Sequence, residues 1–232
     1  MEAKRSAFLV RNCLALLGVA CLIASVEAVY GASEKTILVL GDSLSQGLGL
    51  APNEAYPMLL AKKLRLAGFR FRITNASAAG GTTEGGLERL PGHLKQRIDI
   101  FILELGINDA FQGVPVDQIE NNLQRIINRV KKRNPAVRIV IAGMQLPNYG
   151  ADNYITQFGK IFTDLAAKNR AALVPFLLEN VAGDPSMNLF DGIHPNIAGQ
   201  KILAETVWHV LEPVAAEVSN GSPRPKDSAQ SH

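Results

Sequence analysis

The chain has 232 residues, of which 47% are hydrophobic and 19% are charged, a composition typical of a globular protein and unlike that of a disordered or fibrous chain. The formal net charge is only +3, and the one dense basic run, residues 131–133, ends a helical pattern, where cations stabilise the helix dipole. Nucleic acid is therefore not an expected partner.

The first 28 residues have the pattern of a secretory signal peptide. Basic residues precede an uncharged apolar run over 13–26, and Ala28 offers a small residue at a cleavage position. The run is shorter than the roughly 20 residues that span a bilayer, so we expect no stable membrane anchor after cleavage and a periplasmic or secreted protein. Cleavage after Ala28 would leave 204 residues (232 − 28) and remove both cysteines, Cys13 and Cys21. A disulfide framework, a thiolate metal site and a cysteine nucleophile are then excluded.

Segments rich in branched aliphatic residues alternate with helical patterns along the rest of the chain. The predicted strands cover 36–40, 69–74, 98–105, 137–142 and 171–174; the predicted helices cover 54–67, 83–97 with a break at Pro91, 116–132, 153–168, and Pro195 to about Leu211. Several strands lack polar alternation, as expected when helices cover both faces of a parallel sheet. We predict a doubly wound, three-layer α/β sandwich with a mainly parallel five-stranded sheet over 29–218, followed by a disordered tail over 219–232.

Polar and glycine-rich segments follow the predicted strands, at the edge where open parallel sheets bind ligands. They are Gly-Asp-Ser over 41–43, a segment over 75–82 that contains Gly80, Gly-Ile-Asn-Asp over 106–109, and Asp-Gly-Ile-His-Pro over 191–195. Each segment alone is as consistent with a helix cap or a turn as with a catalytic role. Their conjunction at matching positions of the sheet favours a hydrolase.

The residue types in these segments supply the parts of a serine hydrolase. Ser43 is a candidate nucleophile, His194 is the base that would take its proton, and Asp191 is the carboxylate that would orient the imidazole. Attack on a carbonyl builds an oxyanion that needs positioned donors. The Ser43 and Gly80 N–H groups and the Asn108 amide are candidates.

The motifs GDSL (41–44), the Gly80 segment, GIND (106–109) and DGIHPN (191–196) resemble, in this order, the four blocks of the SGNH (GDSL) hydrolase superfamily. The sequences NAS, RLP, LELG, LPNYG and PFLLE are similar to the bacterial thioesterase I, lysophospholipase and arylesterase group, so the resemblance covers about 36–213. It implies a flavodoxin-like sheet, no cofactor, a Ser43–His194–Asp191 triad, and an oxyanion hole of Ser43, Gly80 and Asn108. Ile107 departs from the glycine that relatives often carry.

Two loops beyond the strands are candidates for substrate binding. Phe111 follows the oxyanion asparagine, and Leu146, Pro147 and Tyr149 follow the fourth strand. An acyl-chain groove would account for apolar residues in these loops, whereas ordinary packing of the loops against the domain is the alternative.

Other acidic and glycine residues have simpler interpretations. Asp42 is expected to order the nucleophile turn, and Asp99 and Glu104 are expected to be structural. A dinucleotide site is disfavoured because the Gly47 motif lacks its third glycine. A metal site is disfavoured because no further histidine lies near Asp191 and His194 in the sequence.

The predicted function is a serine esterase that hydrolyses acyl esters or thioesters of small molecules through an acyl-serine intermediate. Two alternatives remain open: a carbohydrate O-acetyl esterase, which would prefer short acyl groups, and a non-catalytic acyl-ligand binding protein. The sequence predicts neither a preferred acyl chain length nor an oligomeric state.

Overall fold

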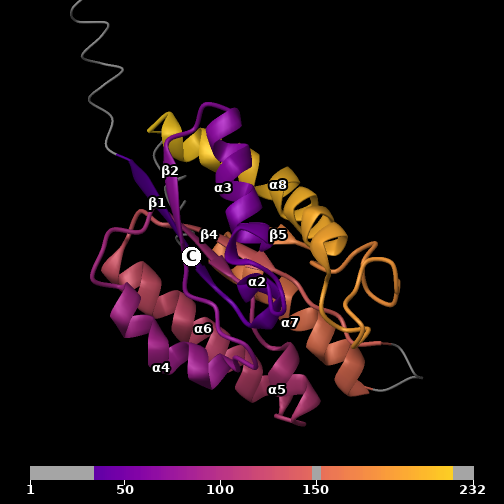
Figure 1. The fold of residues 1–232 in the computed structure, drawn as a ribbon. Coiled ribbons are helices and arrows are strands. Elements are labelled where there is room, and N and C mark those ends of the chain that lie inside the picture. The colour runs from indigo at the N-terminus through magenta and orange to yellow at the C-terminus, as the bar shows by residue number, and fades with distance from the viewer. Residues whose placement is uncertain (1–33, 148–152, 222–232) are drawn as a thin grey trace, which may run out of the picture. The chain divides into compact units, whose positions relative to one another are not determined.

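The structure, a computed structural model, describes residues 34–147 and 153–221. The predicted signal peptide and residues 222–232 of the predicted tail lie outside the described residues. Within them, a five-stranded sheet has the order β2-β1-β3-β4-β5, and every strand pairing is parallel (Figure 1). The strands are β1 (Lys35–Leu40), β2 (Phe71–Asn75), β3 (Ile100–Leu103), β4 (Arg138–Ala142) and β5 (Ala172–Val174).

Helices cover both faces of this sheet, as the apolar strands require. They are α2 (Ser43–Gln46), the 3₁₀ helix η1 (Pro52–Glu54), α3 (Tyr56–Leu66), α4 (Thr83–His93), α5 (Ile107–Phe111), α6 (Val116–Arg133), α7 (Asn153–Asn169) and α8 (Ile197–Ser219). Helices α3 and α8 pack together on one face, and α4, α6 and α7 pack side by side on the other (Figure 1). The doubly wound α/β sandwich is therefore confirmed.

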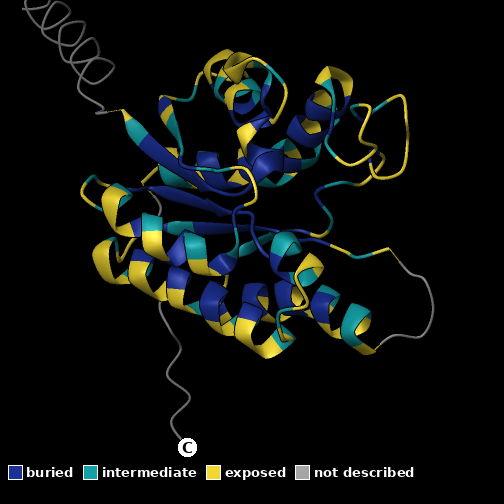
Figure 2. Ribbon diagram, turned by 60° about the horizontal axis from the view of Figure 1, so that its bottom comes forward, coloured by how far each residue is buried: buried dark blue, intermediate teal, exposed yellow. Residues whose placement is uncertain are grey.

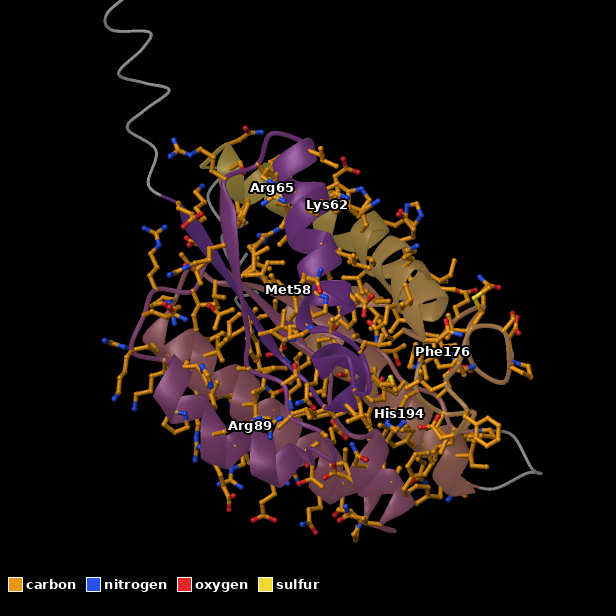
Figure 3. The ribbon with its side chains drawn as sticks, in the orientation of Figure 1. Met58, Lys62, Arg65, Arg89, Phe176 and His194 are labelled. Carbon is orange, nitrogen blue, oxygen red and sulfur yellow. The ribbon has the colours of Figure 1, made fainter. Side chains whose placement is uncertain are left out.

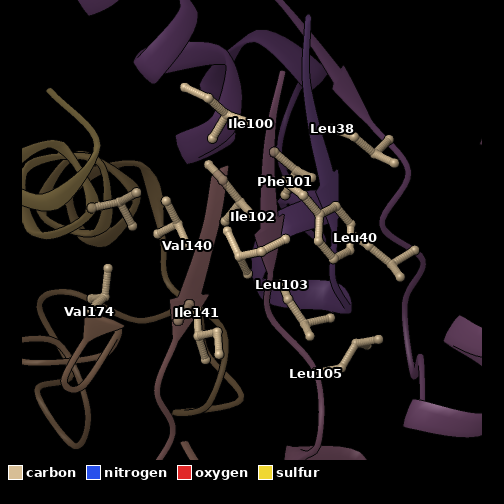
Figure 4. Close-up of a cluster of buried hydrophobic side chains, with 14 of the residues drawn as sticks. Leu38, Leu40, Ile100, Phe101, Ile102, Leu103, Leu105, Val140, Ile141 and Val174 are labelled. Atoms are coloured by element: carbon tan, nitrogen blue, oxygen red, sulfur yellow. The ribbon is translucent and has the colours of Figure 1, made fainter. Parts of the chain in front are cut away.

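The core lies between the sheet and its two helical layers (Figure 2). Strands β1 and β3 are buried on both sides, so nearly all of their residues are apolar, and their side chains pack with those of β4 and β5 (Figure 4). Helix α6 buries one apolar stripe with helical spacing, formed by Ile119, Leu123, Ile126, Ile127 and Val130. Charged residues occupy its outer face.

The third strand is shorter than predicted. The prediction covered 98–105, whereas β3 ends at Leu103. Backbone hydrogen bonds to β1 continue one residue beyond each end, from Asp99 and from Glu104. The apolar pattern therefore reports the buried segment rather than the strand itself, because the chain stays buried as it leaves the sheet at Glu104 and Leu105.

The last helix begins later and ends later than predicted. Asn196 is its N-cap and accepts from the N–H groups of Ala198 and Gly199, so Pro195 precedes the helix instead of opening it. The helix continues past Leu211 and through Pro213 to Ser219. Buried apolar residues continue beyond the proline, and the packing of this stripe outweighs the lost backbone hydrogen bond.

Helix α4 also runs through a proline that we expected to break it. Pro91 cannot donate to the carbonyl of Leu87, one turn earlier. A guanidinium nitrogen of Arg129, on α6, donates to that carbonyl at 2.9 Å. A side chain from the neighbouring helix thus replaces the missing backbone donor, and α4 continues to His93.

Candidate functional site

Ser43, His194 and Asp191 form a continuous hydrogen-bonded chain at the carboxyl edge of the sheet. His194 Nε2 lies 3.0 Å from Ser43 Oγ, and His194 Nδ1 lies 2.6 Å from Asp191 Oδ2. Ser43 follows β1, whereas the other two residues lie in the segment between β5 and α8, where Figure 3 shows His194. The three residues predicted to act together are therefore brought within hydrogen-bonding distance.

The serine lies at the first position of the short helix α2, a helix start whose bounds the sequence prediction did not give. Asp42 is its N-cap, and Asp42 Oδ1 accepts from the N–H of Leu44 at 2.9 Å. Gly47 ends the helix in a left-handed conformation with φ 77°. Asp42 thus orders the nucleophile turn as predicted, and Ser43 has its N–H at a helix start, where no intrahelical acceptor exists.

One buried side chain ties the serine helix to the element that follows the histidine. Gln200, on α8, donates from Nε2 to the carbonyl of Leu44 at 3.1 Å and accepts from the N–H of Tyr56 at 2.7 Å. It therefore pairs a carbonyl of α2 and the first N–H of α3, which has no side-chain cap of its own. The sequence analysis missed this role, since a single glutamine within a helical pattern carries no signal for it.

Asp191 and His194 lie on a short hairpin. Asn188 and Pro195 form an antiparallel bridge, and the N–H of Leu189 donates to the carbonyl of His194 at 2.7 Å. At its base, Asn196 Nδ2 donates to the carbonyls of Ser186 and Asn188 while Asn196 Oδ1 caps α8. The hairpin therefore has its own hydrogen-bonding frame and is attached to the start of the last helix.

Asp191 is ionised over the whole neutral range. Its pKa is lowered to about 2 because the N–H of His194, the His194 ring and the N–H of Ile193 all donate to it. Both backbone bonds reach Oδ1 at 2.9 Å, which leaves Oδ2 for the imidazole. A carboxylate at this position fixes the tautomer with hydrogen on Nδ1, so Nε2 is free to accept the serine proton.

The two other predicted oxyanion donors come from the loops after β2 and β3. Gly80 is exposed with φ 67°, and a Cβ built on it would meet no atom within 4 Å, so its backbone is open to an approaching group. Among the described residues, no acceptor is found for the N–H groups of Gly80 and Ser43. Asn108 Nδ2 instead donates to Asp42 Oδ2 and to the carbonyl of Gly81, both at 3.1 Å.

The neighbour of Asn108 anchors this loop. Asp109 is buried and accepts from the N–H and the hydroxyl of Thr83, at the start of α4. Asn122 of α6 donates to the same hydroxyl at 3.1 Å. Helix α4 directly, and helix α6 through the Thr83 hydroxyl, thus fix the short helix α5 and with it Asn108.

The predicted substrate-binding residues have different environments. Phe111, at the end of α5, is 63% exposed, and Pro147 is also exposed. Leu146 packs against the core, as in the alternative interpretation of its loop. Tyr149 lies outside the described residues. Sequence reasoning missed Phe190 and Ile193, which are exposed and directly precede Asp191 and His194; their interleaving with the polar block is a signal that could have identified them.

Neither a metal cluster nor a membrane-spanning helix is found in the part of the chain that the structure describes. No group of three or more His, Cys, Asp or Glu side chains in residues 34–147 and 153–221 could hold a metal ion. None of the helices in these ranges combines the length and the apolar character needed to cross a bilayer.

The parallel sheet and the serine-histidine-carboxylate chain at its edge define the class of protein, a serine hydrolase built on a doubly wound parallel sheet. More specifically, the chain belongs to the GDSL-like lipase/acylhydrolase family, whose sequence profile matches residues 39–202. The resemblance found in the motifs is thereby confirmed.

Individual relatives cover most of the chain. It is 39% identical over 210 residues to esterase TesA of Pseudomonas aeruginosa, covering 90% of this chain and 98% of the relative. It is 37% identical over 187 residues to an arylesterase of Vibrio mimicus (80% and 92% covered) and 37% identical over 185 residues to thioesterase 1/protease 1/lysophospholipase L1 of Escherichia coli K12 (79% and 86%).

Solved structures show the same fold. The crystal structure of TesA has a TM-score of 0.73 at 38% identity and covers 78% of this chain and 99% of its own. The psychrotrophic esterase EstA from Pseudoalteromonas sp., in a structure inhibited by monoethylphosphonate, has a TM-score of 0.71 at 29% identity, with 77% and 97% covered.

Proposed function

We propose that this protein is an exported carboxylic ester hydrolase that cleaves acyl esters and thioesters through an acyl-serine intermediate on Ser43. The observation that carries the proposal is the unbroken hydrogen-bonded chain from Ser43 Oγ through the His194 ring to Asp191. The relatives named as esterase, arylesterase and thioesterase support the same reaction class.

In the first half of the reaction, Ser43 Oγ attacks the acyl carbonyl while His194 Nε2 takes the serine proton. Asp191 stabilises the imidazolium through Nδ1–H. The tetrahedral intermediate then collapses, and His194 gives the proton to the departing alcohol or thiol. In the second half, a water molecule attacks the acyl-serine by the same proton route and releases the free acid.

The oxyanion would be held by the Ser43 and Gly80 N–H groups together with the Asn108 amide. Both hydrogens of Asn108 Nδ2 have acceptors, so donation to the oxyanion must displace or share one of these bonds. The bond to the neutral Gly81 carbonyl is the weaker, because the other acceptor is the Asp42 carboxyl. We therefore assign the hydrogen that faces Gly81 to the oxyanion.

Apolar side chains cluster in sequence around the site residues and form the proposed acyl rim. Seven large apolar side chains of the described residues are exposed, and five of them lie within five residues of Ser43, Asn108, Asp191 or His194. These five are Leu48, Phe111, Phe190, Ile193 and Ile197. Exposed apolar groups gathered beside a polar site favour an acyl chain over a sugar as the bound part of the substrate.

The test of the nucleophile is Ser43→Ala. Hydrolysis of p-nitrophenyl butyrate should fall by roughly 10⁶ in kcat, and a fluorophosphonate probe should label the wild type but not the variant. The far-ultraviolet circular dichroism and the unfolding midpoint serve as controls for folding. Retained hydrolysis by a folded Ser43→Ala protein, or no labelling of the wild type, would contradict the proposal.

Acyl specificity is tested by Phe111→Ser and Phe190→Ser, each assayed with acetate and octanoate esters and with octanoyl-CoA. Both variants should lose kcat/KM for octanoate by roughly tenfold and change little for acetate, because a buried methylene contributes about 0.8 kcal/mol. Leu66→Ser is the matched control, since Leu66 is 77% exposed but ends α3, at the opposite edge of the sheet. Equal losses on acetate and octanoate would remove the acyl rim from the proposal.

Export, with residues 1–28 as the signal, 29–218 as the hydrolase domain and 219–232 as a polar tail, is part of the same proposal. The N-terminal run of basic and then apolar residues supports it. When the full-length chain is expressed in a bacterial host, fractionation should recover it outside the cytoplasm, cleaved so that Val29 is its first residue. A chain expressed without residues 1–28 should stay in the cytoplasm. Recovery of both chains in the cytoplasm would overturn the assignment.

A further inference from the structure

Two acidic side chains, Asp42 and Glu104, are completely buried beneath the nucleophile turn. Asp42 follows β1 and Glu104 follows β3, and these strands are neighbours, with Leu40 paired to Leu103. The N–H of Asp42 donates to Glu104 Oε2 at 3.1 Å. The ester hydrolysis described above uses neither carboxyl group directly. Because neither side chain is exposed to bulk solvent, their surroundings in the protein decide whether each carboxyl group is protonated.

The two carboxyl groups differ in their hydrogen-bond donors. Asp42 Oδ1 accepts from the N–H of Leu44, and Oδ2 accepts from Asn108 Nδ2. Glu104 Oε2 accepts from the Asp42 N–H and from Ser45 Oγ, but buried Glu104 Oε1 has no partner with a hydrogen to donate among the described residues. A carboxylate oxygen left in this state is costly, whereas a protonated oxygen could itself donate.

Asp42 and Glu104 are in direct contact through the Asp42 N–H and Glu104 Oε2, and both side chains are fully buried. Two ionised carboxylates buried this close together would repel each other with little screening by solvent, so the pair favours the retention of one proton. Burial, followed by the charge of Asp42, raises the pKa of Glu104 well above its ordinary value, and burial raises the pKa of Asp42 to about 6. Both directions agree with a pair that retains a proton where isolated carboxyls would lose it.

The surrounding groups place this proton on Glu104. Ser45 Oγ gives its hydrogen to Glu104 Oε2 at 2.7 Å, so the hydroxyl of Tyr56, 2.7 Å from Ser45 Oγ, must donate to Ser45. Burial raises the pKa of Tyr56, which therefore keeps its proton. On the Asp42 side, the charge of Arg89 favours the ionised form. Arg89, on α4, donates to the carbonyls of Gly41 and Ala76 (Figure 3).

We infer that Glu104 is a protonated positioning residue: its neutral carboxyl group holds the Asp42 N–H and the Ser45 hydroxyl through Oε2, and the ionised Asp42 carboxylate in turn holds the Asn108 amide and the turn that carries Ser43. The inference rests on the proposed function only for the use of Asn108 and Ser43 in catalysis. A proton shared by the pair lets one negative charge, instead of two, lie under the oxyanion site. This limits the electrostatic repulsion that a second buried carboxylate would exert on a developing oxyanion.

The direct test is infrared difference spectroscopy of the Ser43→Ala protein, with and without the further change Glu104→Gln. At pH 7 the first protein should show the C=O stretch of a buried carboxylic acid, and the double variant should lack it. Absence of the band in the first protein overturns the inference. Its persistence in the double variant, together with its loss in Ser43→Ala/Asp42→Asn, also overturns the inference, because the proton then belongs to Asp42. Since Ser43→Ala needs no activity, this readout is independent of the proposed function.

Kinetics test the positioning role in a protein that has Ser43. Gln has a neutral donor and an acceptor at the right positions, so Glu104→Gln should keep kcat within about threefold at pH 7. Asp42→Asn should lower kcat by roughly tenfold or more with KM little changed, because Asn108 and Leu44 lose a charged acceptor. A loss above roughly 100-fold in Glu104→Gln would show that an ionised Glu104 is required, and would overturn the inference.

The pH dependence of stability gives a second readout. The native state holds a proton on Glu104 that the unfolded state releases above about pH 4.5, so the wild type should become less stable as pH rises. Glu104→Gln removes this loss, so its urea midpoint should rise relative to the wild-type midpoint between about pH 5 and pH 8. A constant difference over this range would overturn the inference. Should Glu104→Gln fail to fold, the spectrum of the Ser43→Ala protein still decides whether a buried acid is present.

Discussion

The nucleophile turn and the Asp191–His194 hairpin supply two halves of one site but are held in different ways. Ser43 is 7% exposed, and its turn accepts a hydrogen bond from Gln200 on α8 and donates hydrogen bonds to Glu104, which follows β3. The side chain of Asp191 is 42% exposed, and it accepts hydrogen bonds only from Ile193 and His194 of its own hairpin among the described residues. One half is fixed by packing between distant segments, and the other by a local turn.

This difference predicts that substitutions separate catalysis from stability in the hairpin but not around the nucleophile. Removing a hairpin side chain exposes few buried groups, so the cost falls on the reaction. Removing a partner of the nucleophile turn leaves buried polar groups unpaired, so the cost falls on folding as well. The following variants test this contrast, from the largest expected effect to the smallest.

Asp191→Asn should lower kcat by roughly 10³–10⁴ while the free energy of unfolding changes little. The asparagine oxygen can keep the two backbone bonds, but its amide would face His194 Nδ1 and favour the wrong tautomer. Ester hydrolysis and urea unfolding measure the two effects. Asp184→Asn is the matched control, because Asp184 makes a similar turn with Ser186 in the same segment and lies outside the triad. Comparable kcat losses in both variants would argue against a specific role for Asp191.

Gln200→Leu should reduce the free energy of unfolding by about 2–5 kcal/mol, since the carbonyl of Leu44 and the N–H of Tyr56 are both left unpaired. Because these groups belong to the helices beside the nucleophile, kcat should fall as well. Urea unfolding with parallel kinetics provides the measurement. Gln200→Glu keeps the acceptor for the Tyr56 N–H, and its protonated form can also donate to the Leu44 carbonyl, so this variant should lose less activity at low pH. A stable and fully active Gln200→Leu protein would contradict the contrast between the nucleophile turn and the hairpin.

Asn196 has two roles, to cap α8 and to hold the base of the hairpin, and the variants Asn196→Ala and Asn196→Asp distinguish them. Alanine removes the cap of α8 and should cost about 1–2 kcal/mol of stability. Aspartate keeps the cap acceptor but cannot donate to the carbonyls of Ser186 and Asn188, so its effect should be mainly on kcat. Thermal unfolding and initial rates distinguish the variants. If aspartate were as destabilising as alanine, the cap would not be the source of the stability loss.

The smallest expected effect is the loss of stability at low pH that comes from protonation of Asp191. Its folded pKa of about 2 lies below the ordinary value of 3.8, so its contribution to stability is present above about pH 4 and is lost as pH falls toward 2. The wild-type unfolding midpoint should therefore approach that of Asp191→Asn over this range. Solvent around this exposed carboxyl keeps the change small. A difference that grows toward pH 2 would show that the sign is wrong.

The strands and long helices could be predicted because their periodic burial leaves a pattern in the sequence. Helices α2 and α5, of four and five residues, are too short to carry such a pattern. Helix α4 was expected to break at Pro91, and no local pattern shows that Arg129, 38 residues later, supplies the missing donor. The last helix likewise passes Pro213 because of tertiary packing.

The candidate site follows the same division. The carboxylate and base, three residues apart, could be anticipated from the DGIH motif, and parallel strand ends explain why Ser43 and Asn108 approach them. The bridge made by Gln200 and the contact between Asp42 and Glu104 depend on how neighbouring elements are aligned and on how deeply these side chains are buried. Neither is encoded by spacing along the chain.

The placement of Asp191 and His194 on one hairpin has a consequence for motion at the site. If the hairpin moves as a rigid unit, the Asp191 carboxylate and the His194 imidazole move together. Their 2.6 Å hydrogen bond is then preserved while the 3.0 Å hydrogen bond between His194 and Ser43 is broken. A displaced hairpin would return with the imidazole already in its working tautomer. Recovery of the reactive arrangement would then require only the approach of Nε2 to the serine oxygen.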